Sequence, residues 1–119
     1  MSATKSILVD ECFKSLVQTT EYRAISVVAG RQIIEKALEY QPDLIVLNAD
    51  QPDGFELCQQ LKHDSRLKPI PIILLGKETP LTNAILAYKV GADHFLINPD
   101  NNPSALTNLI EDIFSRQLI

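Results

Sequence analysis

Residues 42–54 read PDLIVLNADQPDG, and this stretch decides the fold. Four consecutive apolar residues, Leu44 to Leu47, lead into Asn48. The run is too short for a buried helix and is typical of a strand that is covered on both faces. Pro42 cannot donate a hydrogen bond to a neighbouring strand, so it belongs at the start of the run. The stretch therefore predicts a buried strand that ends at Asn48, followed by a polar loop with proline and glycine.

Similar apolar runs recur along the chain and alternate with amphipathic segments. Strands are predicted at residues 6–9, 23–28, 43–48, 72–75 and 94–97, and helices at 12–20, 31–40, 55–63, 80–90 and from about 103 onward. Short strands that alternate with helices predict an α/β fold, namely a doubly wound parallel sheet with right-handed crossovers.

The last two predicted helices carry the clearest local signals. The final helix has one regular apolar stripe, made of Leu106, Leu109, Ile110, Ile113 and Phe114. The helix before it has Leu81, Ile85 and Tyr88 or Lys89 at helical spacing. Thr79 followed by Pro80 is typical of a helix start, and Gly91 is typical of the position just after a helix end.

The composition is that of an ordinary globular chain and argues against several classes of protein. The length of 119 residues predicts one domain over residues 1–119. A net charge of −4 argues against nucleic-acid binding by this domain and against an anionic membrane surface. No apolar stretch approaches the roughly 20 residues that span a bilayer, and the first residues lack the apolar core of a signal peptide. The sequence therefore predicts a cytoplasmic protein.

Polar residues gather at the carboxyl ends of the predicted strands. They are Asp10, Glu11, Asn48, Asp50, Gly76, Lys77, Asn98 and Asp100. In a doubly wound sheet these strand ends meet at one edge, so residues far apart in sequence come together there. Two adjacent carboxylates with a third oxygen ligand could hold a hard cation such as Mg²⁺. Alternatively, Asp10 and Glu11 simply end a strand in solvent, and strand position alone leaves both interpretations open.

These residues also carry a resemblance that covers the whole chain. The matching pieces are residues 7–11 (ILVDE), 42–47 (PDLIVL), Pro52 with 53–58 (DGFELC), 71–75 (PIILL), and 90–97 (VGADHFLI) followed by Asn98 and Pro99. In this order they resemble the receiver domains of two-component response regulators. No single piece is specific, but five in the right order are.

The resemblance implies a fold, a role and a set of partners. The fold is flavodoxin-like, a (βα)5 sheet with five parallel strands in the order 2-1-3-4-5. The role is in signal transduction, and the family's partners are a histidine kinase or a downstream output protein. The expected oligomeric state is a monomer or a homodimer.

The chain departs from the family at the positions that carry the chemistry. Asn48 occupies the position of the phosphoacceptor Asp, Gly76 that of a loop Ser or Thr, Asn98 that of a Lys, and Phe95 that of a switching aromatic residue that is often Tyr. The acidic pair remains, as Asp10 and Glu11. The first helix is also shorter than the family usually has.

The substitution at residue 48 removes the nucleophile. Phosphoryl transfer to a receiver needs an ionised carboxylate, a cation and donors around the phosphoryl oxygens, whereas an amide is neither anionic nor basic. The resemblance then implies an atypical receiver, or pseudo-receiver, which acts as a phosphorylation-independent protein-interaction module and not as an enzyme. No cofactor is expected beyond weak Mg²⁺ binding at Asp10 and Glu11, of about millimolar affinity or worse because one carboxylate ligand is lost.

Two alternatives stay open at this point. Asp50 or Asp53 could serve as a substitute phosphoacceptor, since both follow Asn48 closely. The vacated pocket could instead bind a small ligand, because Gly76 leaves space while Asn48 and Asn98 offer hydrogen-bond donors and acceptors.

The other reactive side chains have simpler explanations. Cys12 and Cys58 lack the spacing of a metal or redox site, so both are expected to pack on helix faces. His63 and His94 have no partner at catalytic or ligand spacing, and Lys77 is expected to be a solvated loop lysine. A further surface candidate comes from the family's use of its fourth helix, fifth strand and fifth helix; its residues are Tyr88, Lys89, His94, Asn108 and Asp112.

Overall fold

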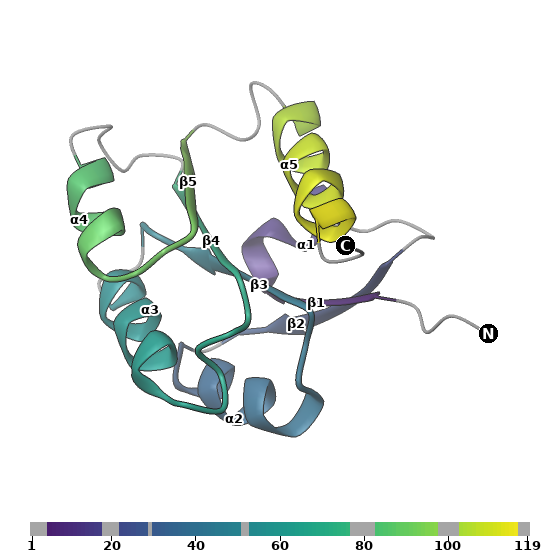
Figure 1. The fold of residues 1–119 in the computed structure, drawn as a ribbon. Helices are drawn as coiled ribbons and strands as arrows, with labels where there is room; N and C mark the ends of the chain where they lie inside the picture. Colours follow the sequence, from purple (N-terminus) through teal and green to yellow (C-terminus); the bar gives the residue numbers. More distant parts are fainter. Residues whose placement is uncertain are drawn as a thin grey trace.

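A five-stranded parallel sheet forms the centre of the molecule. The structure is a computed structural model that describes residues 5–17, 22–28, 30–50, 53–76, 83–97 and 103–116. The strands are β1 (Lys5–Asp10), β2 (Tyr22–Val27), β3 (Leu44–Asn48), β4 (Ile72–Gly76) and β5 (His94–Ile97). They pair in the order β2-β1-β3-β4-β5 (Figure 1). The predicted α/β fold and its strand order are confirmed.

Helices cover both faces of this sheet. They are the 3-10 helix η1 (Glu11–Phe13) and the α-helices α1 (Lys14–Val17), α2 (Gly30–Tyr40), α3 (Gly54–His63), α4 (Ala84–Lys89) and α5 (Pro103–Arg116). Buried side chains of α2, α3 and α4 pack on one face, and those of η1, α1 and α5 pack on the other (Figure 1). None of the helices in the described ranges is both long enough and apolar enough to cross a membrane.

The strand β3 contributes to both halves of the core. Ile45 and Leu47 point into the cluster under α2, α3 and α4, whereas Leu44 and Val46 point into the cluster under α1 and α5. This alternation reflects the two-residue period of a strand. Each such side chain, when fully buried, stabilises the fold by about 1.5–3 kcal/mol. Four consecutive apolar residues in the central strand are therefore what the two layers of helices require.

The start of β3 is fixed against β1 by hydrogen bonds. The Ser6 backbone N–H donates to Asp43 Oδ2 at 2.8 Å, and the Asp43 N–H donates to the Ser6 carbonyl at 2.9 Å. Pro42 is buried just ahead of the strand, where it needs no ladder hydrogen bond. These contacts set the register of β3, and with it the position at which Asn48 leaves the sheet.

The first helix is shorter than predicted. A helix over residues 12–20 was expected, but the structure has one turn of 3-10 helix followed by the single α-helical turn Lys14–Val17, and residues 18–21 lie outside the described ranges. The Asp10 side chain accepts the N–H of Cys12 and so starts a tight turn directly after β1. Phe13 and Val17 are the residues that this short segment buries.

The fourth helix buries Ala87, and Val90 directly after it is also buried. Ile85 and Tyr88 are 69% and 83% exposed, and Tyr88 was expected on the exposed surface. The predicted start at Thr79, with Leu81, lies outside the described residues. The described helix has six residues, and Ala87 is its one buried residue. Gly91 comes next with φ +90°, as its predicted position after the helix end requires.

The first turn of α3 packs directly against the end of β3. A Cβ atom on Gly54 would collide with the backbone carbonyl oxygen of Asn48 and would lie 3.3 Å from the Ala49 Cα. Both obstacles are backbone atoms, which cannot move aside like a flexible side chain. Only glycine therefore permits this close approach of α3 to the candidate site.

We expect Gly54→Ala to lower the free energy of unfolding by roughly 1–3 kcal/mol, the usual cost of forcing extra volume into a packed site. Without the collision, the same change in a helix would stabilise it by about 0.5–1 kcal/mol, so the sign of the effect is diagnostic. Urea unfolding followed by circular dichroism measures it. Gln59→Ala, at an exposed position of the same helix, is the matched control and should stay within about 0.5 kcal/mol of the native chain. A Gly54→Ala variant as stable as the native chain would contradict the close approach.

Candidate functional site

Three strands end together at the carboxyl edge of the sheet. Asp10 ends β1, Asn48 ends β3 and Gly76 ends β4. Asn48 lies opposite Leu75 in the ladder, and the next residue, Ala49, donates its N–H to the Leu75 carbonyl at 2.7 Å. The parallel register therefore brings residues from three separate parts of the sequence to one edge.

The side chain of Asn48 is held at both of its polar ends. Its Nδ2 donates to the Sγ atom of Cys12 at 3.2 Å, and its Oδ1 accepts the backbone N–H of Asp50 at 2.9 Å. The second contact is a local turn that an aspartate could also make. In the first contact the amide donates and the thiol sulfur accepts, whereas an ionised carboxylate at residue 48 could only accept from the thiol S–H. The amide is thus well matched to its immediate surroundings.

The acidic pair is divided between two environments. Asp10 is half-buried, and its Oδ1 accepts the Cys12 backbone N–H at 3.0 Å, whereas Glu11 is exposed. A hard divalent cation needs several oxygen ligands, usually with more than one carboxylate. Within the part of the chain that the structure describes, no three His, Cys, Asp or Glu side chains come together as a metal-binding group. Since Asn48 Oδ1 already accepts a backbone N–H, the donor set fits such a cation poorly.

The remaining predicted positions add little polar chemistry. Gly76 is buried and brings no side chain to the edge. Phe95, the second residue of β5, is half-buried and packs on the side of α2, α3 and α4, with its ring centroid 6.5 Å from that of Phe55. Asn98, Lys77 and Asp100 lie outside the described residues.

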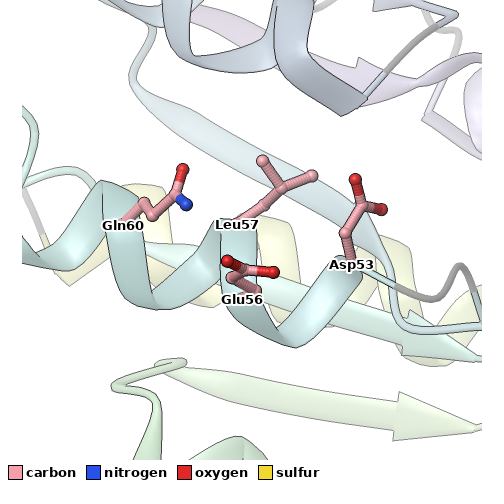
Figure 2. Close-up of a pocket in the computed structure, with 4 residues that line it drawn as sticks. All are labelled: Asp53, Glu56, Leu57 and Gln60. Carbon is pink, nitrogen blue, oxygen red and sulfur yellow. The ribbon is translucent and has the colours of Figure 1, made fainter.

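The two aspartates considered as substitute acceptors lie in different places. Asp50 is exposed just after β3, while Asp53 is half-buried at the start of α3, where its carbonyl accepts the Leu57 N–H at 2.8 Å. Asp53 lines a shallow hollow of about 170 Å³ together with Glu56, Leu57 and Gln60 (Figure 2). Figure 2 shows these side chains along α3, and neither Asn48 nor Gly76 lines the hollow. It is therefore not the vacated pocket expected from the sequence.

The two cysteines differ sharply, and the prediction for one of them was wrong. Cys12 was expected to pack on a helix face, but the tight turn after β1 leaves it exposed, in contact with Asn48. Cys58 is buried in α3, as predicted, and its thiol lies 3.8 Å from the Val90 carbonyl. Burial raises the pKa of Cys58 to about 12; the nearby Lys62 lowers it by less, and Asp93 raises it further.

The Asn48–Cys12 contact is the feature that sequence reasoning missed. The available signal was the position of Cys12, two residues after the strand end that lies beside β3. Helical periodicity hid that signal, because it placed Cys12 inside a longer helix.

Comparison with known proteins agrees with this geometry. Residues 6–111 match the family described as the response regulator receiver domain. The chain belongs to this family. The receiver is 34% identical over 79 residues to the DNA-binding dual master transcriptional regulator RpaA of Synechocystis, covering 65% of this chain and 32% of that protein. It is 31% identical over 104 residues to the alkaline phosphatase synthesis transcriptional regulatory protein PhoP of Bacillus subtilis, covering 80% of this chain and 42% of that protein.

A solved structure supports the same assignment. The signal receiver domain of a signal transduction histidine kinase from Syntrophus aciditrophicus is 27% identical, with a TM-score of 0.79 over 93% of this chain and 90% of that chain. The chain spans less than half the length of RpaA and of PhoP. Its family membership makes it a receiver domain of two-component signalling.

The two thiols should react at very different rates. We expect a disulfide exchange reagent to modify Cys12 rapidly in the folded receiver and Cys58 only after unfolding, because Cys58 is buried and its pKa is raised to about 12. Counting modified thiols with and without urea, with Cys12→Ser as the matched variant, measures this. Two rapidly reacting thiols in the folded chain would contradict the burial of Cys58.

The raised pKa of Cys58 also predicts a pH dependence of stability. The thiol ionises near 9.0 in the unfolded chain but only near 12 in the folded one, so between these values the unfolded state loses a proton that the folded state keeps. Stability attributable to this group is constant below about pH 9 and falls by up to about 1.4 kcal/mol per pH unit above it. Urea unfolding between about pH 8 and about pH 10 measures the slope. Cys58→Val should have a smaller slope, and an unchanged slope would contradict the assignment.

Proposed function

We propose that this receiver works as a phosphorylation-independent protein-interaction module, a pseudo-receiver, in two-component signalling. The observation that carries the proposal is the state of Asn48 at the end of β3. This residue stands where the resemblance places the family's phosphoacceptor Asp. Its carboxamide offers no anionic oxygen for attack, and both of its polar ends already have partners, Cys12 and the Asp50 N–H.

The groups that would support a phosphoryl group are also missing from the sequence. Gly76 has no hydroxyl, Phe95 has none either, and Asn98 stands at the family's Lys position. A phosphoryl group adds about −1.5 to −2 charges. At this edge that charge would lie near the carboxylates of Asp10 and Glu11. The phosphoacceptor Asp, the loop hydroxyl and the Lys of the family are thus all replaced in this chain. The joint replacement of these three groups supports the proposal that the site does not accept a phosphoryl group.

Metal binding is proposed to be weak. Asp10 and Glu11 would be the residues nearest to a bound Mg²⁺, but the third carboxylate of a complete site is an amide here. Each carboxylate ligand contributes strongly to the affinity for a hard cation. We therefore expect an affinity of about millimolar or worse. No step of the proposed function passes through the metal.

The proposed partner is a protein. One relative is a DNA-binding regulator, and a similar solved receiver comes from a histidine kinase, so a histidine kinase or an output protein suits this chain. Its own net charge of −4 argues against direct DNA binding by this domain. We place the receiver in the cytoplasm as a single domain over residues 1–119, monomeric or homodimeric, without enzymatic turnover.

The decisive experiment exposes the receiver to a small phosphoryl donor. We expect no stable, stoichiometric mass gain of one phosphoryl group after incubation with acetyl phosphate and Mg²⁺, measured by intact-protein mass spectrometry. A receiver that keeps the acceptor Asp, treated in the same tube, is the positive control. A stoichiometric adduct on the native chain would overturn the proposal. Asp50→Asn and Asp53→Asn, labelled separately, would then show which of the two substitute acceptors carries it.

Restoring the carboxylate gives a second, independent test. We expect Asn48→Asp to bind Mg²⁺ roughly tenfold more tightly than the native chain, because it returns the third carboxylate. A titration followed by the thermal unfolding midpoint measures the affinity, with Asn48→Ser as the neutral control. Equal Mg²⁺ affinity of Asn48→Asp and the native chain would show that residue 48 does not face the cation.

A further inference from the structure

A lysine with little solvent exposure joins three segments at the opposite edge of the sheet. Lys62, near the end of α3, directs its Nζ to the Asp93 Oδ2 at 2.8 Å, the Ile70 carbonyl at 2.9 Å and the Lys68 carbonyl at 3.1 Å. An ammonium group has three donors, and all three are used. The side chain is only 14% exposed. The segments joined are α3, the chain leading into β4, and the turn between α4 and β5.

The carboxylate that pairs with Lys62 has a second partner. Asp93 Oδ2 also accepts the backbone N–H of Ile72, the first residue of β4, at 2.8 Å. The Asp93 N–H in turn donates to the Ile72 carbonyl at 2.9 Å. One carboxylate thus aligns the starts of β4 and β5 while it neutralises Lys62. Because it ties two neighbouring strands, a movement of Asp93 would disturb the edge strand β5.

The turn that follows α4 packs against the methylene groups of Lys62. A Cβ on Gly91 would lie 3.1 Å from Lys62 Cγ, so the Lys62 methylenes pass directly beside the Gly91 backbone. The chain there turns with φ +90°, and Ala92 donates its N–H to the Ala87 carbonyl at 3.1 Å. Such a turn satisfies the last carbonyls of the helix. Lys62 therefore contacts the end of α4 through its stem and the start of β5 through its charge.

We propose that Lys62 is a positioning residue that locks α4 and β5 onto α3 through Asp93. This lock fixes the position of α4 relative to α3 and β5. It thereby also fixes the positions of Ile85 and Tyr88, the exposed side chains of α4. It lies at the amino ends of the parallel strands, away from Asn48 at their carboxyl ends. Its action does not depend on whether the carboxyl edge accepts a phosphoryl group, so this proposal and the proposed function fail or succeed separately.

The low exposure of Lys62 makes the lock effective, although the Asp93 side chain is 40% exposed. Hydrogen bonds to charged groups contribute more than neutral ones, and removing the Asp93 carboxylate leaves the Lys62 ammonium, whose side chain is only 14% exposed, without a counter-charge. An opening of the α4–β5 turn would break the Lys62–Asp93 ion pair and the hydrogen bond from the Ile72 N–H to Asp93 at the same time. Local opening of this region is therefore linked to one interaction, which a substitution can remove without touching α1, α5 or the carboxyl edge.

Amide hydrogen exchange measured by mass spectrometry tests the lock. In Lys62→Met we expect peptides covering residues 84–97 to exchange roughly tenfold faster than in the native chain, relative to peptides covering β1 and β3 in the same sample. Asp93→Asn keeps an oxygen for the Ile72 N–H and loses the charge, so it should show the same local pattern in a milder form. The double variant should exchange no faster than Lys62→Met alone, because both changes remove one interaction.

The matched control is Lys68→Met. Its exposed side chain loses a charge of the same sign, while its backbone carbonyl remains available to Lys62. Residues 84–97 should then exchange as in the native chain. Faster exchange spread evenly over all peptides of both Lys62→Met and Asp93→Asn would mean general destabilisation and would overturn the proposal. Additive effects in the double variant, or unchanged exchange at residues 84–97, would overturn it as well.

Discussion

Burial of β3 on both faces is the constraint on which the rest of the structure depends. Leu44, Ile45 and Val46 are completely buried, and their side chains alternate between the two layers of helices. Pairing with β1 on one side and β4 on the other leaves this strand no freedom of register, because a shift by one residue would exchange its two faces. The packing of β3 therefore places Asn48 at the carboxyl edge of the sheet, and this placement does not depend on the chemistry of the Asn48 side chain.

The sequence was sufficient for the architecture because the signal lies in short, uninterrupted apolar runs. Those runs predicted all five strands and the stripe of α5, of which Leu106, Ile110, Ile113 and Phe114 are buried. Prediction failed where tertiary contacts outweigh periodicity. The first helix gives way to a tight turn, in which Asp10 accepts the N–H of Cys12. Periodicity counts apolar residues, but it does not detect a polar side chain that starts a turn.

The candidate site was only partly readable in advance. Strand ends and the right register were enough to place Asp10, Asn48 and Gly76 at one edge. The contact between Asn48 and Cys12 was missed, because it depends on the turn geometry after β1, which helical periodicity hid. The polar network around Lys62 gave no sequence signal either, since a lysine at the end of a helix is usually a solvated charge. Sequence patterns are least able to predict contacts that a single side chain makes across a loop.

The two edges of the sheet carry different kinds of contact, structural ones at the amino ends of the strands and the candidate site at their carboxyl ends. At the amino edge, Lys62 and Asp93 connect α3 to the starts of β4 and β5. At the carboxyl edge, Asn48 keeps two hydrogen bonds without a carboxylate. Asn48 places no charge beside Asp10, and the receiver fold forms with this asparagine at the end of β3. The packing that fixes the fold is therefore independent of the chemistry that residue 48 can carry out.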